Sequence, residues 1–180
     1  LLVNDNLKVN IFEINFMLQL GTPNDLEIYQ KWSNYFKHKN DSQIKFIDNF
    51  NTTTILPLAG YGSRFLKEGY KLPKPLLPVD NNIMVIQAIK SLPQSTNNIF
   101  ICLRDHLNNY NLKEEINKEY PNSKIISINN VTNGQATSCF LGLKEFNLEK
   151  PILISACDNG VHYNVKKYQE LVDDVNIDVI

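Results

Sequence analysis

The stretch from Ile55 to Val79 constrains this chain more than any other, and it reads ILPLAGYGSRFLKEGYKLPKPLLPV. The apolar run at its start has the character of a buried β-strand, and it ends in a turn that contains two glycines. A loop of small residues lets backbone N–H groups approach a phosphate, because no Cβ blocks the way. We therefore expect nucleotide-binding backbone donors from Leu58, Ala59, Gly60, Tyr61, Gly62 and Ser63.

Two cations follow this loop and are the candidate catalytic residues. Arg64 comes directly after it and carries a planar fork of donors, which suits the β- and γ-phosphates of a nucleoside triphosphate (NTP). Lys74 stands between two prolines that fix the local backbone direction, and its compact charge suits an α-phosphate or a phosphorylated acceptor. We expect Lys71, by contrast, to lie on a solvated surface.

Two common nucleotide-binding motifs do not fit this segment. A P-loop requires Gly-Lys-Ser/Thr after the glycines, and no such triplet follows them. In a dinucleotide-binding turn the third glycine would stand where this chain has Phe65, and the crossover helix would run through three prolines, Pro73, Pro75 and Pro78. Asp80 lies where the ribose-binding acid of that motif would lie, but it follows the prolines and is expected to be a turn residue.

From about residue 54 onward, short apolar runs alternate with segments of helical periodicity. This alternation predicts an α/β fold, a mostly parallel sheet flanked by helices on both faces in a Rossmann-like arrangement. Ligands of such sheets bind at the carboxyl ends of the strands, and both the Gly60 loop and Asp158 directly follow predicted strands. The predicted strands are 54–58, 99–103, 124–128, 152–156 and 177–180, and the predicted helices are 85–92, 112–120, 136–143 and 165–172.

Asp158 follows the apolar run PILISA (residues 151–156) after a single intervening residue and is the candidate metal ligand. Mg²⁺ usually takes one or two carboxylates together with phosphate oxygens and water, so a carboxylate at a strand end beside a triphosphate loop suits it. Asp-Asn-Gly is also a strong turn sequence that could simply close a hairpin. Both interpretations stay open, and Mg²⁺ is the expected cofactor.

The first 50 residues do not fit the alternation. Residues 8–16 read as one or two strands, and Thr22, Pro23 and Asp25 predict a helix start, as N-cap, N1 and N3 residues. Residues 38–53 are polar and poorly patterned, which is typical of a linker. We therefore expect an appended strand-helix segment with a linker over residues 1–50, and a nucleotide-binding unit over residues 51–180.

Composition excludes several classes of partner. The net charge of −1 gives no basic field for nucleic acid, and the longest apolar runs are too short to span a membrane. The three cysteines lack a Cys-x-x-Cys spacing, so we expect buried free thiols in a reducing compartment, the cytoplasm. His38, His106 and His162 have no metal-ligand spacing and are expected on the surface or in turns.

The segments LAGYGSRF and PKPLLPV together resemble the signature region of the nucleotidylyltransferases that act on sugar phosphates and related phosphomonoesters. Residues 132–138 and 154–159 continue the resemblance in the family's order, so that it covers roughly residues 53–180. It implies the amino-terminal, nucleotide-binding half of a domain with the GT-A-like fold. It also implies transfer of a nucleoside monophosphate from an NTP to a phosphorylated small acceptor, first of all a sugar 1-phosphate, in nucleotide-sugar and polysaccharide biosynthesis.

The resemblance assigns the turn at residues 133–135 to the base of the nucleotide. It implies backbone contacts from Gly134, with side-chain hydrogen bonds from Asn133 or Gln135. A plain helix start capped by Asn133 or Thr132 explains the same residues equally well.

The segment LGTPNDLEIYQKW resembles the closing part of such a domain, yet here it precedes the nucleotide-binding motifs. The order suggests the tail of one domain joined to the head of a second, in a longer tandem polypeptide. The resemblance places a second acidic ligand and the acceptor pocket beyond residue 180, so we expect this chain to be incomplete as an enzyme.

Other functions remain open at this stage. They are a cytidylyltransferase for a non-sugar phosphomonoester, a nucleotide-binding regulatory module without turnover, and a glycosyltransferase of similar architecture. The last usually needs Asp-x-Asp, and the residues from Asp158 to Gly160 lack the second acid. The expected partners are an NTP and the acceptor, and a homo-oligomer is possible.

Overall fold

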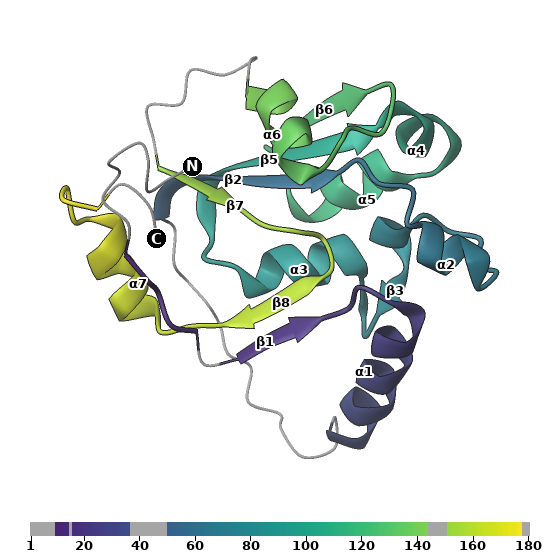
Figure 1. The fold of residues 1–180 in the computed structure, drawn as a ribbon, viewed down its shortest axis with the longest axis horizontal. Helices are drawn as coiled ribbons and strands as arrows, with labels where there is room; N and C mark the ends of the chain where they lie inside the picture. The colour runs from purple at the N-terminus through teal and green to yellow at the C-terminus, as the bar shows by residue number, and fades with distance from the viewer. Residues whose placement is uncertain (1–9, 15, 37–49, 144–150, 178–180) are drawn as a thin grey trace.

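A parallel four-stranded sheet forms the centre of the computed structural model, which describes residues 10–14, 16–36, 50–143 and 151–177. Its strand order is β6-β5-β2-β7, with β2 at Phe50–Leu58, β5 at Ser95–Leu103, β6 at Lys124–Ile128 and β7 at Ile152–Ile154 (Figure 1). All three pairings are parallel. The carboxyl ends of these strands therefore meet at one edge of the sheet, where ligands of such folds bind.

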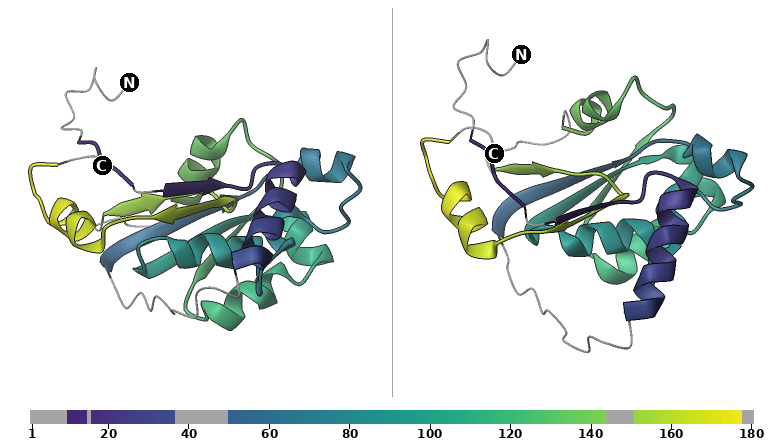
Figure 2. Two further views of the ribbon diagram at one scale, coloured as in Figure 1. Left: turned by 90° about the horizontal axis from the view of Figure 1, so that it is seen from below. Right: turned by 60° about the horizontal axis from the view of Figure 1, so that its bottom comes forward.

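Helices cover both faces of this sheet, as the alternating pattern predicts (Figure 2). On one face, Leu56 and Phe100 pack with α3 (Met84–Ser91) and α5 (Leu112–Glu119). On the other face, Ile55 and Ile101 pack with Cys139 of α6 (Gln135–Leu143). The predicted α/β class is thus confirmed, because neighbouring residues of each central strand enter two separate hydrophobic clusters.

β2 begins earlier than predicted, and its polar residues explain why. Residues 50–53 were expected in a linker but belong to the strand. The hydroxyls of Thr52 and Thr54 both lie within hydrogen-bonding distance of the Ser95 hydroxyl, at 2.5 and 2.7 Å, so these buried polar groups satisfy one another. Residues 38–49 of the expected linker lie outside the described residues, and the division into two domains stays a prediction.

The N-terminal segment forms β1 (Phe16–Gln19) and α1 (Pro23–Phe36). Of the one or two strands predicted at 8–16, residues 10–14 lie in no regular element, and only Phe16, where β1 begins, is in a strand. The predicted helix start is confirmed. The Thr22 amide donates to the Asp25 carboxylate at 3.0 Å and the Asp25 amide donates to the Thr22 hydroxyl at 3.2 Å, a reciprocal capping pair.

Two further antiparallel pairs were not predicted. β1 pairs with β8 (Asn159–His162), and β3 (Pro78–Val79) pairs with β4 (Asn82–Ile83). Asp80 lies in the β3–β4 turn with a φ of 53°, which confirms the expectation of a turn residue. Asp158 lies in a turn too, but this turn joins β7 to a strand of a different sheet and closes no hairpin.

The remaining elements are short. They include α2 (Ser63–Lys67), a 3₁₀ turn at Lys74–Leu76, α4 (Arg104–Asn109) and α7 (Val165–Val172). α4 was not predicted, and the strand predicted at 177–180 is not supported at Ile177, while 178–180 lie outside the described residues. Within the described ranges, no helix combines the length and apolar character that a bilayer crossing requires.

Candidate functional site

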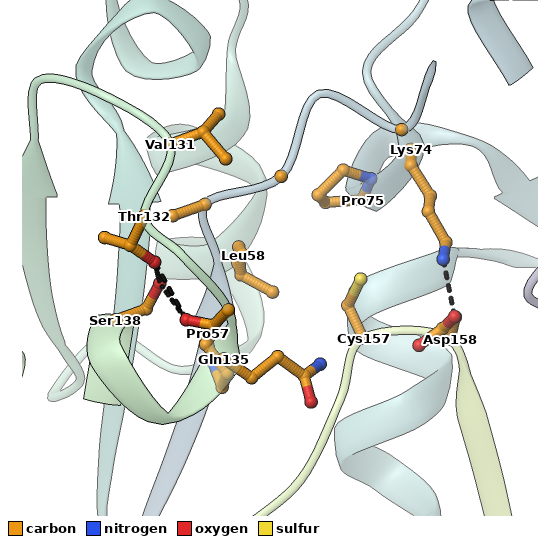
Figure 3. A pocket seen from close by; sticks show the side chains of 14 residues that line it. Pro57, Leu58, Lys74, Pro75, Val131, Thr132, Gln135, Ser138, Cys157 and Asp158 are labelled. Atoms are coloured by element: carbon orange, nitrogen blue, oxygen red, sulfur yellow. Dashed lines mark hydrogen bonds and ion pairs between the residues drawn. The ribbon is translucent and has the colours of Figure 1, made fainter. Parts of the chain in front are cut away.

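A cavity of about 260 Å³ opens at the carboxyl ends of β2 and β7, where three sequence segments meet (Figure 3). These segments are the loop after β2 with the proline-framed lysine, the turn before α6, and the turn after β7. All three contain residues that the sequence analysis selected. The cavity is lined by Pro57, Leu58, Ala59, Gly60, Gly62, Lys74, Pro75, Val131, Thr132, Gly134, Gln135, Ser138, Cys157 and Asp158.

The conformation of the glycine loop, residues 58–63, depends on Gly62. This residue has a φ of 61°, in the left-handed region, and precedes the first residue of α2. A Cβ at this position would lie 2.9 Å from the Cβ of Lys74, so only glycine lets the loop and the lysine segment come this close. The Gly62 carbonyl accepts hydrogen bonds from the amides of Phe65 and Leu66, which anchors the loop to α2.

Lys74 extends along one wall of the cavity to the turn after β7 (Figure 3). Its Nζ lies 2.5 Å from Oδ2 of Asp158, and the two side chains are only 18% and 17% exposed (Figure 3). Nζ also lies 5.8 Å from the centre of the Phe65 ring, within the range of a cation–π interaction. The predicted lysine and the predicted carboxylate thus form a direct, largely buried ion pair.

Cys157 precedes this carboxylate and also lines the cavity, although it is only 8% exposed. Burial, with the negative charge of Asp158 as a smaller cause, raises the pKa of its thiol to about 12. The thiol therefore stays protonated near neutral pH and does not serve as a nucleophile. All three cysteines are buried and free, which confirms that expectation.

The turn before α6 forms the opposite wall. The Thr132 hydroxyl donates to the Gly134 carbonyl at 2.8 Å and lies 2.6 Å from the Ser138 hydroxyl, so these two side chains brace the turn. Gly134 has a φ of 129°, a conformation that side-chain-bearing residues rarely adopt. The Gln135 side chain extends toward the middle of the cavity in Figure 3.

Four of the selected residues do not line this cavity. Tyr61 and Ser63 belong to the glycine loop but are not among the lining residues, and neither is Asn133 of the turn before α6. Arg64 lines a neighbouring open groove of about 420 Å³ between α1 and α2. The other residues of that groove are Thr22, Pro23, Asn24, Glu27, Lys67 and Glu68.

His106 was expected on the surface or in a turn, and this expectation is wrong. It is 4% exposed, and its ring packs edge-on against Tyr61 of the glycine loop, with the ring centres 6.4 Å apart. Burial lowers the pKa of this imidazole, and its Nδ1 has no hydrogen-bond partner in the part of the chain that the structure describes. No spacing signal marks His106, because its contact with the loop depends on where α4 follows β5. His162 lies in β8, and His38 falls outside the described residues.

The residues that line the cavity are too few to hold a metal ion by themselves, so the metal would need further oxygen atoms from a bound ligand. Among the described residues, no group of three or more His, Cys, Asp or Glu side chains is placed to hold a metal. Asp158 supplies a single carboxylate at the cavity wall, and Mg²⁺ commonly combines one carboxylate with phosphate oxygens and water. The residues present therefore suit a Mg²⁺ ion that arrives with a polyphosphate.

The fold is similar to those of solved nucleotidyltransferases. A nucleoside-diphosphate-sugar pyrophosphorylase from Vibrio cholerae matches with a TM-score of 0.49 and 23% identity, over 58% of this chain and 46% of that one. An inositol-1-phosphate CTP transferase from T. maritima matches with a TM-score of 0.49 and 18% identity, over 58% of this chain and 42% of that one. A nucleotidyl transferase from Methanothermobacter matches with a TM-score of 0.47 and 17% identity, over 59% and 50%.

The matched region spans about half the length, or slightly less, of these solved structures. No protein-family model matches the chain, and no curated protein matches it.

Proposed function

We propose that the cavity binds an NTP and serves the transfer of its nucleoside monophosphate to a phosphorylated small acceptor, first of all a sugar 1-phosphate. The observation that carries this proposal is the meeting of Lys74 and Asp158 beside the glycine loop. These residues come from segments far apart in the sequence, yet the ion pair joins them at the wall of one cavity. A cation, a carboxylate and a loop of backbone amides are the groups that a metal-bound triphosphate requires.

In this reaction a phosphate oxygen of the acceptor attacks the α-phosphorus. The bond from that phosphorus to the bridging oxygen breaks, and pyrophosphate leaves with the electron pair. Both reactants are anions, so catalysis consists mostly of charge neutralisation and alignment, and it needs no covalent nucleophile. This agrees with the protonated, buried thiol of Cys157.

Lys74 is the residue to which we assign the α-phosphate. Its ammonium group has three donors, so it can contact a phosphate oxygen while it remains near Asp158. Asp158 would hold Mg²⁺, which when bound neutralises charge on the phosphates and orients them. Before the metal and the triphosphate bind, the positive charge of Lys74 and the negative charge of Asp158 neutralise each other.

Arg64 remains our candidate for the departing β- and γ-phosphates. It belongs to α2, which begins directly after the glycine loop. This role requires its side chain to turn from the groove beside α1 toward the loop. Gly134 and Gln135 are assigned to the base, because they lie on the wall opposite Lys74 and Gln135 has both a donor and an acceptor.

Calorimetric titration tests the binding step. ATP, CTP, GTP, UTP and dTTP would each be titrated into the full chain with Mg²⁺, and we expect saturable binding of at least one of them that is weakened in Lys74→Ala. Pyrophosphate release with glucose 1-phosphate, and with a non-sugar phosphomonoester plus CTP, then separates the acceptor classes. Binding without turnover would support the binding step alone, and failure to bind any of the five NTPs would refute the proposal.

A further inference from the structure

The N-terminal segment lies directly against Asp158, although the sequence analysis assigned it to a separate unit. β1 runs antiparallel to β8, with Gln19 opposite Asn159 (Figure 1). Immediately after β1, the Leu20 amide donates a hydrogen bond to the backbone carbonyl of Asp158 at 2.8 Å. The main chain of the candidate metal ligand is therefore held by a residue from before the predicted linker.

The segment is docked by more than this strand pairing. Leu20 and Leu26 are buried in one hydrophobic cluster with Phe65, which belongs to α2. At the far end of the contact, the Tyr29 and Ser33 hydroxyls both donate to the Asp80 carboxylate in the β3–β4 turn, each at 2.5 Å. Burial and the hydrogen bond to Asp80 raise the pKa of Tyr29 to about 12, so this donor keeps its proton. Apolar burial and charge-assisted hydrogen bonds thus fix α1 at several points.

The N-terminal segment also lies near the carboxylate group of Asp158, at Gly21. A Cβ placed on Gly21 would lie 3.6 Å from Oδ2 of Asp158 and 3.4 Å from Nε2 of Gln19. These are ordinary contact distances for a Cβ, so Gly21 leaves about the space of one methyl group between its backbone and the Asp158 side chain. The carboxylate is consequently bounded by Lys74 on one side and by the Gln19–Gly21 turn on another.

A second, smaller cavity of about 60 Å³ shows that Asp158 lies between the candidate nucleotide cavity and the N-terminal segment. Cys157 and Asp158 line both this cavity and the candidate nucleotide cavity. The remaining walls come from β1, α1, α3 and β8, among them Leu18, Leu20 and Tyr29. Displacement of the N-terminal segment would therefore remove residues that pack beside the Asp158 turn.

We propose that residues 16–36 are a working part of the nucleotide site, in which Leu20 and Gly21 act as positioning residues for Asp158. The boundary predicted at residue 50 does not divide the site. This inference rests on the proposed function, because it assumes that Asp158 holds Mg²⁺ with a bound NTP. Residues that orient a metal ligand typically change metal affinity by about 10- to 100-fold when they are altered.

The test is the Mg²⁺ dependence of NTP binding in Gly21→Val. A Cβ at Gly21 makes only ordinary contacts, so we expect the two γ-methyl groups of valine to crowd Asp158 or Gln19, the neighbours of that Cβ, whereas the glycine loop is not among those neighbours. We expect the Mg²⁺ concentration for half-maximal enhancement of binding to rise about 10- to 100-fold. The affinity for the same NTP in EDTA should stay within about twofold of wild type. Asn97→Val is the matched control, since it places the same side chain at an exposed position of β5, outside residues 16–36, and should leave both quantities unchanged.

A second variant covers the case in which Gly21→Val fails to fold. The double variant Tyr29→Phe/Ser33→Ala removes both hydrogen bonds to Asp80 at the other end of the segment, and we expect a smaller shift in the same direction. Unchanged Mg²⁺ dependence in every folded variant, with NTP binding intact, would overturn this inference alone. If wild type binds no NTP in EDTA or in Mg²⁺, it is the proposed function that fails.

Discussion

The two sides of the candidate cavity are built in different ways. On the loop side, Gly60 and Tyr61 are exposed, and the hydrogen bonds that hold the loop run between Gly62 and its close neighbours in sequence. On the other side, Asp158 is partly buried, and its contacts come from Lys74 and Leu20, both remote in sequence. Local conformational preference thus shapes one side, and long-range packing shapes the other.

This difference implies that the two sides respond differently to substitution. The loop depends on residues that allow an unusual backbone and on the contact of Tyr61 with His106. The Asp158 turn depends on the docking of separate elements. Changes in the loop should act on nucleotide binding directly, whereas changes around Asp158 should act through the metal.

The largest effect of a substitution is expected at Lys74, which contacts both the glycine loop and the Asp158 turn. Lys74→Ala should lower the rate of nucleotidyl transfer by about 10²–10³, or about 2.7–4 kcal/mol, because a preorganised charge at the reacting phosphate is lost. Lys71→Ala should change little, since Lys71 is exposed and its charge is screened by water and salt. The measurement is kcat of the active protein with both substrates saturating. Equal losses in the two variants would mean that Lys74 is an ordinary surface lysine.

A pair of glycine substitutions sharpens the account of the loop. Gly62→Ala should lower the free energy of unfolding by about 1–3 kcal/mol, because φ is 61° and the new Cβ would meet Lys74 at 2.9 Å. Gly60→Ala meets nothing within 4 Å and should leave stability unchanged or raise it by up to about 1 kcal/mol. Urea unfolding of both variants provides the comparison. A Gly60→Ala variant as unstable as Gly62→Ala would contradict the described loop conformation.

A smaller, pH-dependent effect is expected at His106. Its pKa in the folded protein is lowered by burial, so the unfolded chain takes up the proton first as the pH falls. The stability contributed by neutral His106 should therefore be present above about pH 6.5 and be lost as the pH falls through the folded-state pKa. Urea midpoints at several pH values should decline less steeply toward acid in His106→Phe than in wild type. Parallel curves would exclude His106 as the titrating group.

The smallest effect is expected at Cys157, whose thiol should not react with an alkylating reagent in the folded protein. With a pKa of about 12 its thiol is protonated at pH 8, and it is nearly inaccessible. Iodoacetamide should leave Cys157 unmodified in the folded protein and label it after unfolding, as mass spectrometry of peptides would show. Rapid labelling in the folded state would mean that the Asp158 turn opens readily, contrary to its docking by β1.

The same contrast explains what the sequence could predict. The strand ends, the glycine loop and Lys74 carry local signals, namely apolar runs, glycines and flanking prolines. Leu58, Gly60, Gly62 and Lys74 do line one cavity, although Tyr61 and Ser63 do not. The capping pair at Thr22 and Asp25 is equally local and was predicted. The alternation of strands and helices was sufficient for the fold class.

The features that were missed depend on contacts between distant segments. The pairing of β1 with β8 left no periodic signal, because each strand has only four residues. The burial of His106 follows from α4, a six-residue helix too short to show helical periodicity. The pairing of Lys74 with Asp158 could be expected only as a shared edge of the sheet, and its direct contact required the three-dimensional structure.

A crystal structure of the protein with Mg²⁺ and a non-hydrolysable NTP analogue tests the central claim most directly. The account predicts the triphosphate on the Gly60–Gly62 loop, the α-phosphate in contact with Lys74, the metal on Asp158, and the base beside Gln135. A nucleotide bound elsewhere, for example in the groove lined by Arg64 and Lys67 with the Lys74–Asp158 ion pair undisturbed, would contradict it.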